Sequence, residues 1–225
     1  MQLEVRDIQK RFGKKQVLRG ASFLAEGGAA VGLVGVNGSG KSTLLRILAG
    51  VLRADGGACL LDGTDLLSAG RELSRRVGYV PQGTPLAGEL SAYDNLRLWY
   101  GRAALERSLQ EGVLAELGVG EFLRTRADRL SGGMKKRLVI GCAMARDPRI
   151  LLLDEPTAVL DPAAKAWVLG YVRRFCGGGG AAVIATHDPE ELALCGYGYL
   201  LRDGLLGEYD VRGGLRSLAE AGHGG

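Results

Sequence analysis

The sequence has few residues that could hold a transition metal. It contains two His and four Cys residues, and the cysteines lie far apart with no C-x-x-C pair. Structural zinc sites are built from closely spaced Cys and His residues. The composition therefore excludes a zinc module, and the scattered cysteines indicate free thiols in a reducing compartment.

Long apolar runs are also missing. A membrane-spanning helix needs about 20 consecutive, mainly apolar residues. The longest charge-free stretches, residues 27–40 and 175–187, are shorter and rich in glycine. The N-terminus carries Glu4, Arg6 and Asp7 where a secretory signal needs an apolar centre. We therefore expect a soluble intracellular protein.

Glycine is in marked excess, with 37 among 225 residues, whereas its usual share is about 7%. The glycines follow no G-X-Y period, which excludes a collagen-like chain, so we expect them in turns and loops. Apolar residues make up 46% and charged residues 24% of the chain, the ordinary balance of a globular protein.

Positive charge is in slight excess, with a formal net charge of +4 that falls within residues 91–149. Such a segment could face phosphate, nucleic acid or anionic lipid, but a solvated helical face explains it equally simply. The charge alone therefore selects no partner.

The apolar patterns predict an α/β fold. Short apolar runs are typical of buried parallel strands, whereas residues 91–147 have helical character. Strands are expected at residues 2–8, 17–24, 29–36, 149–153, 181–185, 197–202 and 205–211, and helices at 42–49 and 162–175. Strands and helices that alternate around one helical insert predict a central parallel sheet.

Residues 35–42 fit the pattern G-x-x-x-x-G-K-[ST] between an expected strand and an expected helix. Glycines let backbone N–H groups face phosphate oxygens, and the helix N-terminus adds its positive dipole end. Lys41 can reach the β- and γ-phosphates, and the hydroxyl of Ser42 can bind Mg²⁺. The residues expected at the nucleotide are Gly35, Asn37, Gly38, Ser39, Gly40, Lys41, Ser42 and Thr43.

A second motif, residues 150–155, is an apolar run that ends in two acids. Such a strand places carboxylates at the carboxyl edge of the sheet, where α/β proteins bind ligands. Asp154 is then a candidate for holding Mg²⁺, and Glu155 for polarising a water in line with the γ-phosphate. Alone, such a run would not indicate a nucleotide site, but together with the phosphate loop formed by residues 35–42 it does.

A third motif is Ser131-Gly132-Gly133, at the start of an expected helix. Its hydroxyl and N–H groups can bind another anion, although a plain helix cap is the alternative interpretation. One nucleotide does not easily contact both helix starts of one compact subunit. The pair of motifs therefore suggests nucleotides shared between two subunits.

Together these motifs resemble those of the nucleotide-binding subunit of ABC transporters, over essentially the whole chain. The phosphate loop is the least specific match. Residues 130–133 resemble the signature sequence of that family and are the most specific match, and residues 150–155 are similar to its Walker B segment with the adjacent catalytic glutamate.

The resemblance assigns roles to four further residues. Gln82 resembles the Q-loop glutamine that senses Mg²⁺ and the attacking water, and His187 resembles the switch histidine at the γ-phosphate. Asp161 lies in a segment similar to the D-loop, and Phe12 stands where an aromatic ring stacks on adenine. Read alone, Gln82 and His187 would be ordinary loop residues and Phe12 a core residue.

Three residues depart from the pattern of that family. Met134 ends the signature where Gln is commonest, Val159 replaces a small or polar residue before the D-loop, and Phe12 lacks the hydroxyl of the more frequent Tyr. The serine and glycine contacts to phosphate do not need the Met134 side chain, and the phenyl ring of Phe12 can still stack.

The resemblance implies a P-loop NTPase (RecA-like) core with a mainly parallel sheet, an N-terminal antiparallel β portion and an inserted α-helical signature subdomain. It implies one ABC ATPase domain, residues 1–225. The core would comprise residues 1–86 and 148–225, and the helical subdomain residues 87–147.

The function implied is hydrolysis of ATP with Mg²⁺ by a subunit that powers a separate membrane permease from the cytoplasmic face. Two copies, or this chain and a related one, would pack head to tail around two ATP molecules, with no nucleic-acid partner. Residues 91–101 and the short length resemble exporter-like ATPases without a C-terminal regulatory domain.

Two other functions stay open at this stage. A soluble ABC-type ATPase acting on nucleic acid or ribosomes would usually carry coiled coils, zinc modules or a second cassette. A P-loop kinase would need neither the Ser131 motif nor the D-loop.

Overall fold

The computed structural model describes residues 1–68, 73–211 and 213, and only the backbone of residues 73 and 74. Its strands are β1 (Gln2–Phe12), β2 (Lys15–Glu26), β3 (Ala30–Val34), β4 (Gly56–Leu61), β5 (Thr64–Asp65), β6 (Val77–Val80), β7 (Ile150–Asp154), β8 (Ala181–Ala185), β9 (Tyr197–Arg202) and β10 (Leu205–Tyr209). The α-helices are α1 (Lys41–Leu48), α2 (Leu73–Arg76), α3 (Ala92–Arg97), α4 (Arg102–Glu111), α5 (Val113–Glu116), α6 (Gly132–Ala143), α7 (Pro162–Gly177) and α8 (Pro189–Leu192). Short 3₁₀ turns lie at Val119–Phe122 and Ala127–Arg129.

The described strands form two sheets. The larger has the order β10-β9-β3-β8-β7-β6, and its strands from β9 to β6 pair in parallel. The smaller has the order β2-β1-β4-β5 and is antiparallel. This arrangement confirms the predicted mainly parallel sheet with an antiparallel β portion at the N-terminus.

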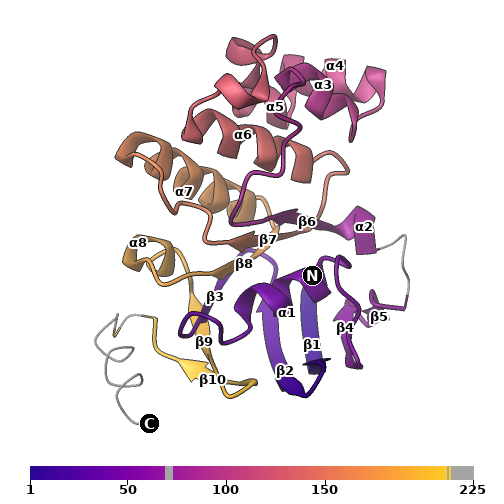
Figure 1. The fold of residues 1–225 in the computed structure, drawn as a ribbon, viewed down its shortest axis with the longest axis vertical. Coiled ribbons are helices and arrows are strands. Elements are labelled where there is room, and N and C mark those ends of the chain that lie inside the picture. Colours follow the sequence, from indigo (N-terminus) through magenta and orange to yellow (C-terminus); the bar gives the residue numbers. More distant parts are fainter. Residues whose placement is uncertain (69–72, 212, 214–225) are drawn as a thin grey trace.

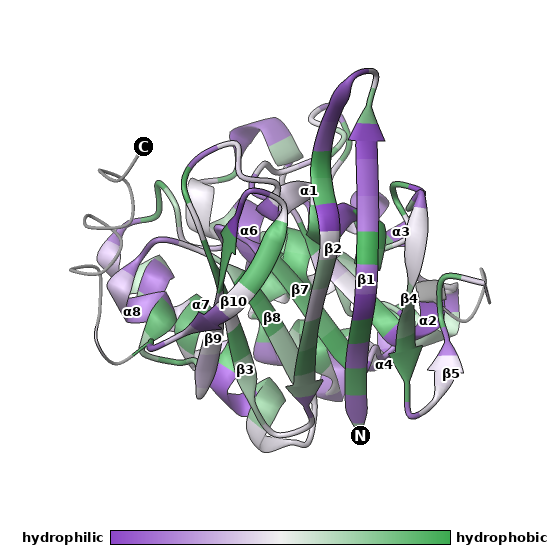
Figure 2. Cartoon of the chain, turned by 90° about the horizontal axis from the view of Figure 1, so that it is seen from below, coloured by the Kyte–Doolittle hydropathy of each residue, from purple (hydrophilic) through white to green (hydrophobic). Residues whose placement is uncertain are grey.

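The central sheet is buried on both faces, which explains its continuous apolar runs. Along β7, Leu151 and Leu153 pack into a core with α6 and α7, whereas Ile150 and Leu152 pack into a second core with α1 and the antiparallel sheet. Figure 2 shows the hydrophobic strands β7 and β8 behind β1 and β2. The alternation of side chains along one strand thus holds three layers together.

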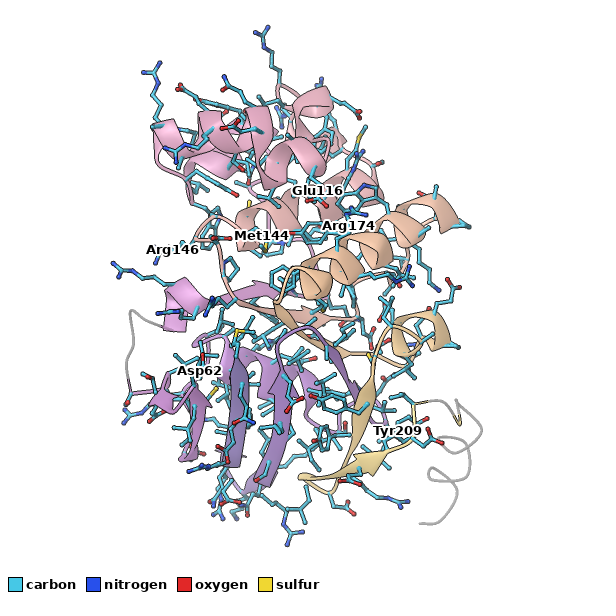
Figure 3. The ribbon with its side chains drawn as sticks, turned by 180° about the vertical axis from the view of Figure 1, so that it is seen from behind. Asp62, Glu116, Met144, Arg146, Arg174 and Tyr209 are labelled. Carbon is cyan, nitrogen blue, oxygen red and sulfur yellow. The ribbon has the colours of Figure 1, made fainter. Side chains whose placement is uncertain are left out.

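The helices α3 to α6 gather at one end of the molecule, beyond α7, while α1 and the antiparallel sheet lie toward the other end (Figure 1). A salt bridge joins α5 to α7, with Nε of Arg174 2.6 Å from Oε1 of Glu116 (Figure 3). None of the described helices is long and apolar enough to cross a membrane.

Several elements differ from the sequence-based expectations. The hairpin strands are longer than predicted, since β1 continues to Phe12 and β2 begins at Lys15. The strand β4 was not predicted, because Gly56 and Gly57 interrupt its pattern. Gly57 adopts φ 94°, and a Cβ there would lie 2.5 Å from the carbonyl oxygens of Arg6 and Asp7. The backbone of β1 thus needs a glycine opposite it.

Candidate nucleotide and hydrolysis site

The phosphate loop joins the buried strand β3 to α1, as the motif predicts. Gly35 has φ 155°, and a Cβ there would lie 2.6 Å from the carbonyl oxygen of Leu201 and 2.8 Å from the hydroxyl of Ser39. Gly40 precedes the helix with φ 114°. These two glycines let the loop turn tightly against β9, so that the N-terminus of α1 opens into the loop.

Lys41 lies inside this loop. Its ammonium donates to the carbonyl oxygens of Gly35, at 2.6 Å, and Val36, at 3.3 Å, and the residue is only 6% exposed. Burial lowers the pKa of Lys41, while the carboxylates of Glu155 and Asp154 oppose this shift. A buried ammonium held by backbone carbonyls is well placed to move onto a phosphate.

The other loop residues vary in exposure. Asn37 and Gly38 are exposed, whereas Ser39 and Thr43 are half-buried. The hydroxyl of Ser39 is buried and has no hydrogen-bond partner among the described residues. A buried hydroxyl without a partner is costly unless a ligand satisfies it. The loop therefore fits a phosphate group.

Ser42 and Asp154 meet across α1 and β7. The hydroxyl of Ser42 donates to Oδ1 of Asp154 at 3.0 Å. Burial raises the pKa of Asp154, and the bond from Ser42 opposes this shift. A hydroxyl beside a carboxylate is a suitable oxygen pair for Mg²⁺, which keeps waters and phosphate oxygens as its other ligands. The described residues hold no cluster of three or more His, Cys, Asp or Glu side chains that could hold a metal.

Sequence reasoning missed Tyr79. It lies on β6, and its hydroxyl donates to Oδ2 of Asp154 at 3.5 Å. Burial and the nearby Asp154 raise the pKa of Tyr79, so the phenol stays protonated and can donate. In the sequence, Tyr79 could have been recognised as an aromatic residue with a polar end, three positions before Gln82. Its strand, β6, pairs in parallel with β7.

Glu155 follows β7 with φ 44°, a left-handed conformation that is uncommon for a residue with a side chain. Nε2 of Gln82 donates to its Oε2 at 2.8 Å, and Nδ1 of His187 lies 3.3 Å from its Oε1. Gln82 thus contacts Glu155 here, and not Asp154. Three loops that follow β6, β7 and β8 converge on one carboxylate, which the sequence order alone did not show.

The Ser131 motif and the D-loop segment pack against each other. Ser131 is exposed and caps α6 by accepting from the N–H of Met134 at 3.2 Å, and Asp161 caps α7 by accepting from Ala164 at 2.9 Å. A Cβ at Gly133 would lie 2.8 Å from Cβ of Ala164. The two helix starts therefore touch at a position where only glycine fits.

Two more site residues are exposed. Gly132 would carry a Cβ 3.7 Å from Leu160, so it faces the D-loop segment as well. Phe12 is at the end of β1 and 48% exposed, with the ammonium of Lys10 5.6 Å from its ring centre. Phe12 is therefore not a core residue, and its ring is accessible to a ligand.

Comparison with known proteins agrees with this geometry. The ABC transporter family profile matches residues 18–158. The chain is 36% identical over 193 residues to the Nod factor export ATP-binding protein I of Burkholderia lata, covering 84% of this chain and 64% of that protein. It is 35% identical over 216 residues to the lipoprotein-releasing system ATP-binding protein LolD of Porphyromonas gingivalis, covering 92% of this chain and 99% of that protein.

The chain also resembles solved structures. A dimeric ATP-binding cassette in a post-hydrolysis state with ADP and Pi superimposes with a TM-score of 0.80 at 26% identity, covering 93% of this chain and 99% of that chain. A nucleotide-free ATP-binding cassette of an ABC transporter, with 24% identity and full coverage of both chains, has the same fold at a TM-score of 0.87. By its sequence and its structure, the chain belongs to the ABC transporter family, in which it is an ATP-binding cassette.

Proposed function

We propose that this chain hydrolyses ATP to ADP and phosphate with Mg²⁺, and that this reaction powers transport through a separate membrane permease. The observation that carries the proposal is the convergence of Gln82 and His187 on Glu155, beside the Ser42–Asp154 pair. This arrangement places a candidate base next to a phosphate loop.

Each side chain of the site has a separate role in hydrolysis. Lys41 and the N–H groups at the start of α1 bind the β- and γ-phosphates, and Ser42 and Asp154 would hold Mg²⁺. Bound Mg²⁺ neutralises charge on the phosphate oxygens. Glu155 orients the attacking water and takes up its proton, with Gln82 and His187 fixing the carboxylate from either side. The exposed ring of Phe12 stacks on the adenine.

The site is completed by a second subunit. Ser131 is exposed, and no described hydrogen bond joins the Ser131 motif to the phosphate loop of its own chain. The hydroxyl of Ser131 and the N–H groups of Gly132 and Gly133 contact the γ-phosphate of a nucleotide bound by the other subunit, with Asp161 beside them. A head-to-tail homodimer or heterodimer follows. Support comes from solved cassettes of this family that are dimers.

Names of relatives support a transport role. Nod factor export and lipoprotein release are the processes named for two of them. The chain spans 64% of the length of the Nod factor relatives. We infer that it works in export, bound to its permease at the cytoplasmic face of the membrane, and that it has no nucleic-acid or ribosomal partner. Within the chain, residues 87–147 act as the helical subdomain of one ATPase domain.

A phosphate-release assay tests this function. The purified chain should release phosphate from ATP only with Mg²⁺, and Asp154→Asn should lose most of that activity. Asp128→Asn, which changes an exposed acid of the helical segment in the same way, is the matched control. Equal rates with and without Mg²⁺ would contradict the proposal. Co-purification with one membrane protein from detergent extracts tests the permease.

A further inference from the structure

Lys136 is a buried lysine whose ammonium bonds to backbone and not to an acid. It lies in the second turn of α6 and is 2% exposed. Its Nζ lies 3.3 Å from the carbonyl oxygen of Pro81 and 3.4 Å from that of Gln82. Burial lowers the pKa of Lys136, while the more distant carboxylates of Glu191 and Asp154 oppose this shift. Burying an ammonium lowers the stability of the folded state, whereas burying a methionine side chain of similar length would not.

The two carbonyls belong to the segment that joins the sheet to the helical subdomain. Strand β6 ends at Val80, and the chain then leaves the sheet through Pro81 and Gln82. Two consecutive carbonyls held by one ammonium fix the backbone at this point. The contact joins two segments that are far apart in the sequence, since α6 begins at Gly132.

The backbone of Gln82 carries the side chain that contacts Glu155. Nε2 of Gln82 lies 2.8 Å from Oε2 of Glu155, so a shift of the backbone by an ångström would break this bond. Among the hydrogen bonds of the described residues, the one from Lys136 alone joins the backbone of Gln82 to α6.

We propose that Lys136 is a positioning residue that holds the backbone of Gln82 so that the Gln82 side chain stays on Glu155. This inference rests on the proposed roles of Gln82 and Glu155 in hydrolysis. Lys136 lies on the same helix as Ser131, five residues further on. If α6 moves when Ser131 contacts the nucleotide of a second subunit, the side chain of Lys136 therefore transmits that movement to the backbone of Gln82.

The test is a double-mutant cycle on ATP hydrolysis by the full chain. Lys136→Met should lower kcat by roughly 10-fold and leave KM and monomer ATP affinity within about twofold, because the geometry of hydrolysis changes and the phosphate loop does not. In the Gln82→Ala background the same substitution should change kcat by less than about twofold. The alanine has already removed the side chain of residue 82 that Lys136 would position.

Lys135→Met is the matched control, because it makes the same change at the neighbouring, half-exposed position of α6. Its kcat should equal that of the parent. Amide hydrogen exchange gives a second readout. Residues 82–88 should exchange faster in Lys136→Met, whereas residues 132–143 of α6 should keep their protection. If the methionine variant does not fold, Lys136→Gln, which keeps an N–H donor, is measured in the same cycle.

The outcomes distinguish the positioning role of Lys136 from the proposed role of Gln82 in hydrolysis. If Lys136→Met lowers kcat equally with Gln82 present or absent, the lysine only supports the fold and the inference is overturned. If Lys136→Met has no effect while Gln82→Ala is impaired, the inference fails and the proposed function stands. If Gln82→Ala itself hydrolyses ATP at the parental rate, the proposed role of Gln82 fails first.

Discussion

His187 and Glu155 face each other at one edge of the central sheet, with Nδ1 of the imidazole 3.3 Å from Oε1 of the carboxylate. They follow β8 and β7, which are adjacent parallel strands in which Ala185 pairs with Asp154. Parallel neighbours end at the same edge, so residues far apart in the sequence meet there. Because Gln82 binds the other oxygen, the carboxylate is oriented from two sides.

Removing the charge of Glu155 while keeping its shape should separate binding from hydrolysis. In Glu155→Gln, ATP should still bind, and kcat should fall by on the order of 10²-fold or more, because the amide cannot accept a proton from water. ATP should then hold two subunits together, so gel filtration should show a dimer with ATP and mostly monomer with ADP. Hydrolysis at the parental rate would remove Glu155 from the mechanism.

Lys41 should be required for binding. Its ammonium is the one buried positive charge within the phosphate loop, and charge-assisted hydrogen bonds contribute roughly 1.5–3 kcal/mol each. Lys41→Ala should therefore raise the Kd for a fluorescent ATP analogue by at least about tenfold. Lys15→Ala, at an exposed position of β2, is the control. An unchanged Kd in Lys41→Ala would show that the loop is not the phosphate site.

Phe12→Ala should weaken the binding of adenine more than it slows turnover. Stacking acts equally on the ground state and the transition state, and it is worth about 1–3 kcal/mol per base. The expected result is a raised KM with kcat retained. A lower kcat with an unchanged KM would instead indicate a structural role for Phe12.

Ser131 should act on a nucleotide bound by the other subunit. Ser131→Arg places a long cationic side chain at the exposed start of α6, so ATPase activity should be lost while a dilute monomer still binds ATP. Lys41→Ala should fail at binding instead. In a mixed dimer of the two variants one composite site is intact, so mixing two inactive proteins should restore up to about half of the activity per mixed dimer. Loss of ATP binding by the Ser131→Arg monomer would contradict the shared site.

Val159 combines full exposure with a strained backbone. It is fully exposed and has φ 59°, although it is β-branched, and a left-handed conformation costs such a residue about 1–2 kcal/mol. Val159→Asn should raise the free energy of unfolding by about 1 kcal/mol, since Asn tolerates this conformation. Thermal unfolding checks this. Val51→Asn, at another exposed valine without positive φ, should give no gain.

The sequence alone was sufficient to predict the parts of the site that depend on backbone conformation. Glycines at 35 and 40 and the apolar run of β7 identify a turn and a strand from local pattern alone. The contacts of Tyr79 and Lys136 could not be predicted in this way. A tyrosine on a short strand and a lysine after a helix cap both have ordinary local explanations, and their partners are set by how distant strands and helices pack.

The close approach of Gly133 to Ala164 has a consequence for partner choice. Because a Cβ at residue 133 would lie only 2.8 Å from the neighbouring helix, the loops before α6 and α7 keep a fixed spacing. In the proposed head-to-tail dimer, a second subunit would therefore meet Ser131 and Asp161 as a single rigid edge. If the chain pairs with a related cassette, that partner must fit both loops at once, so we expect pairing to depend on the shape of the edge as a whole.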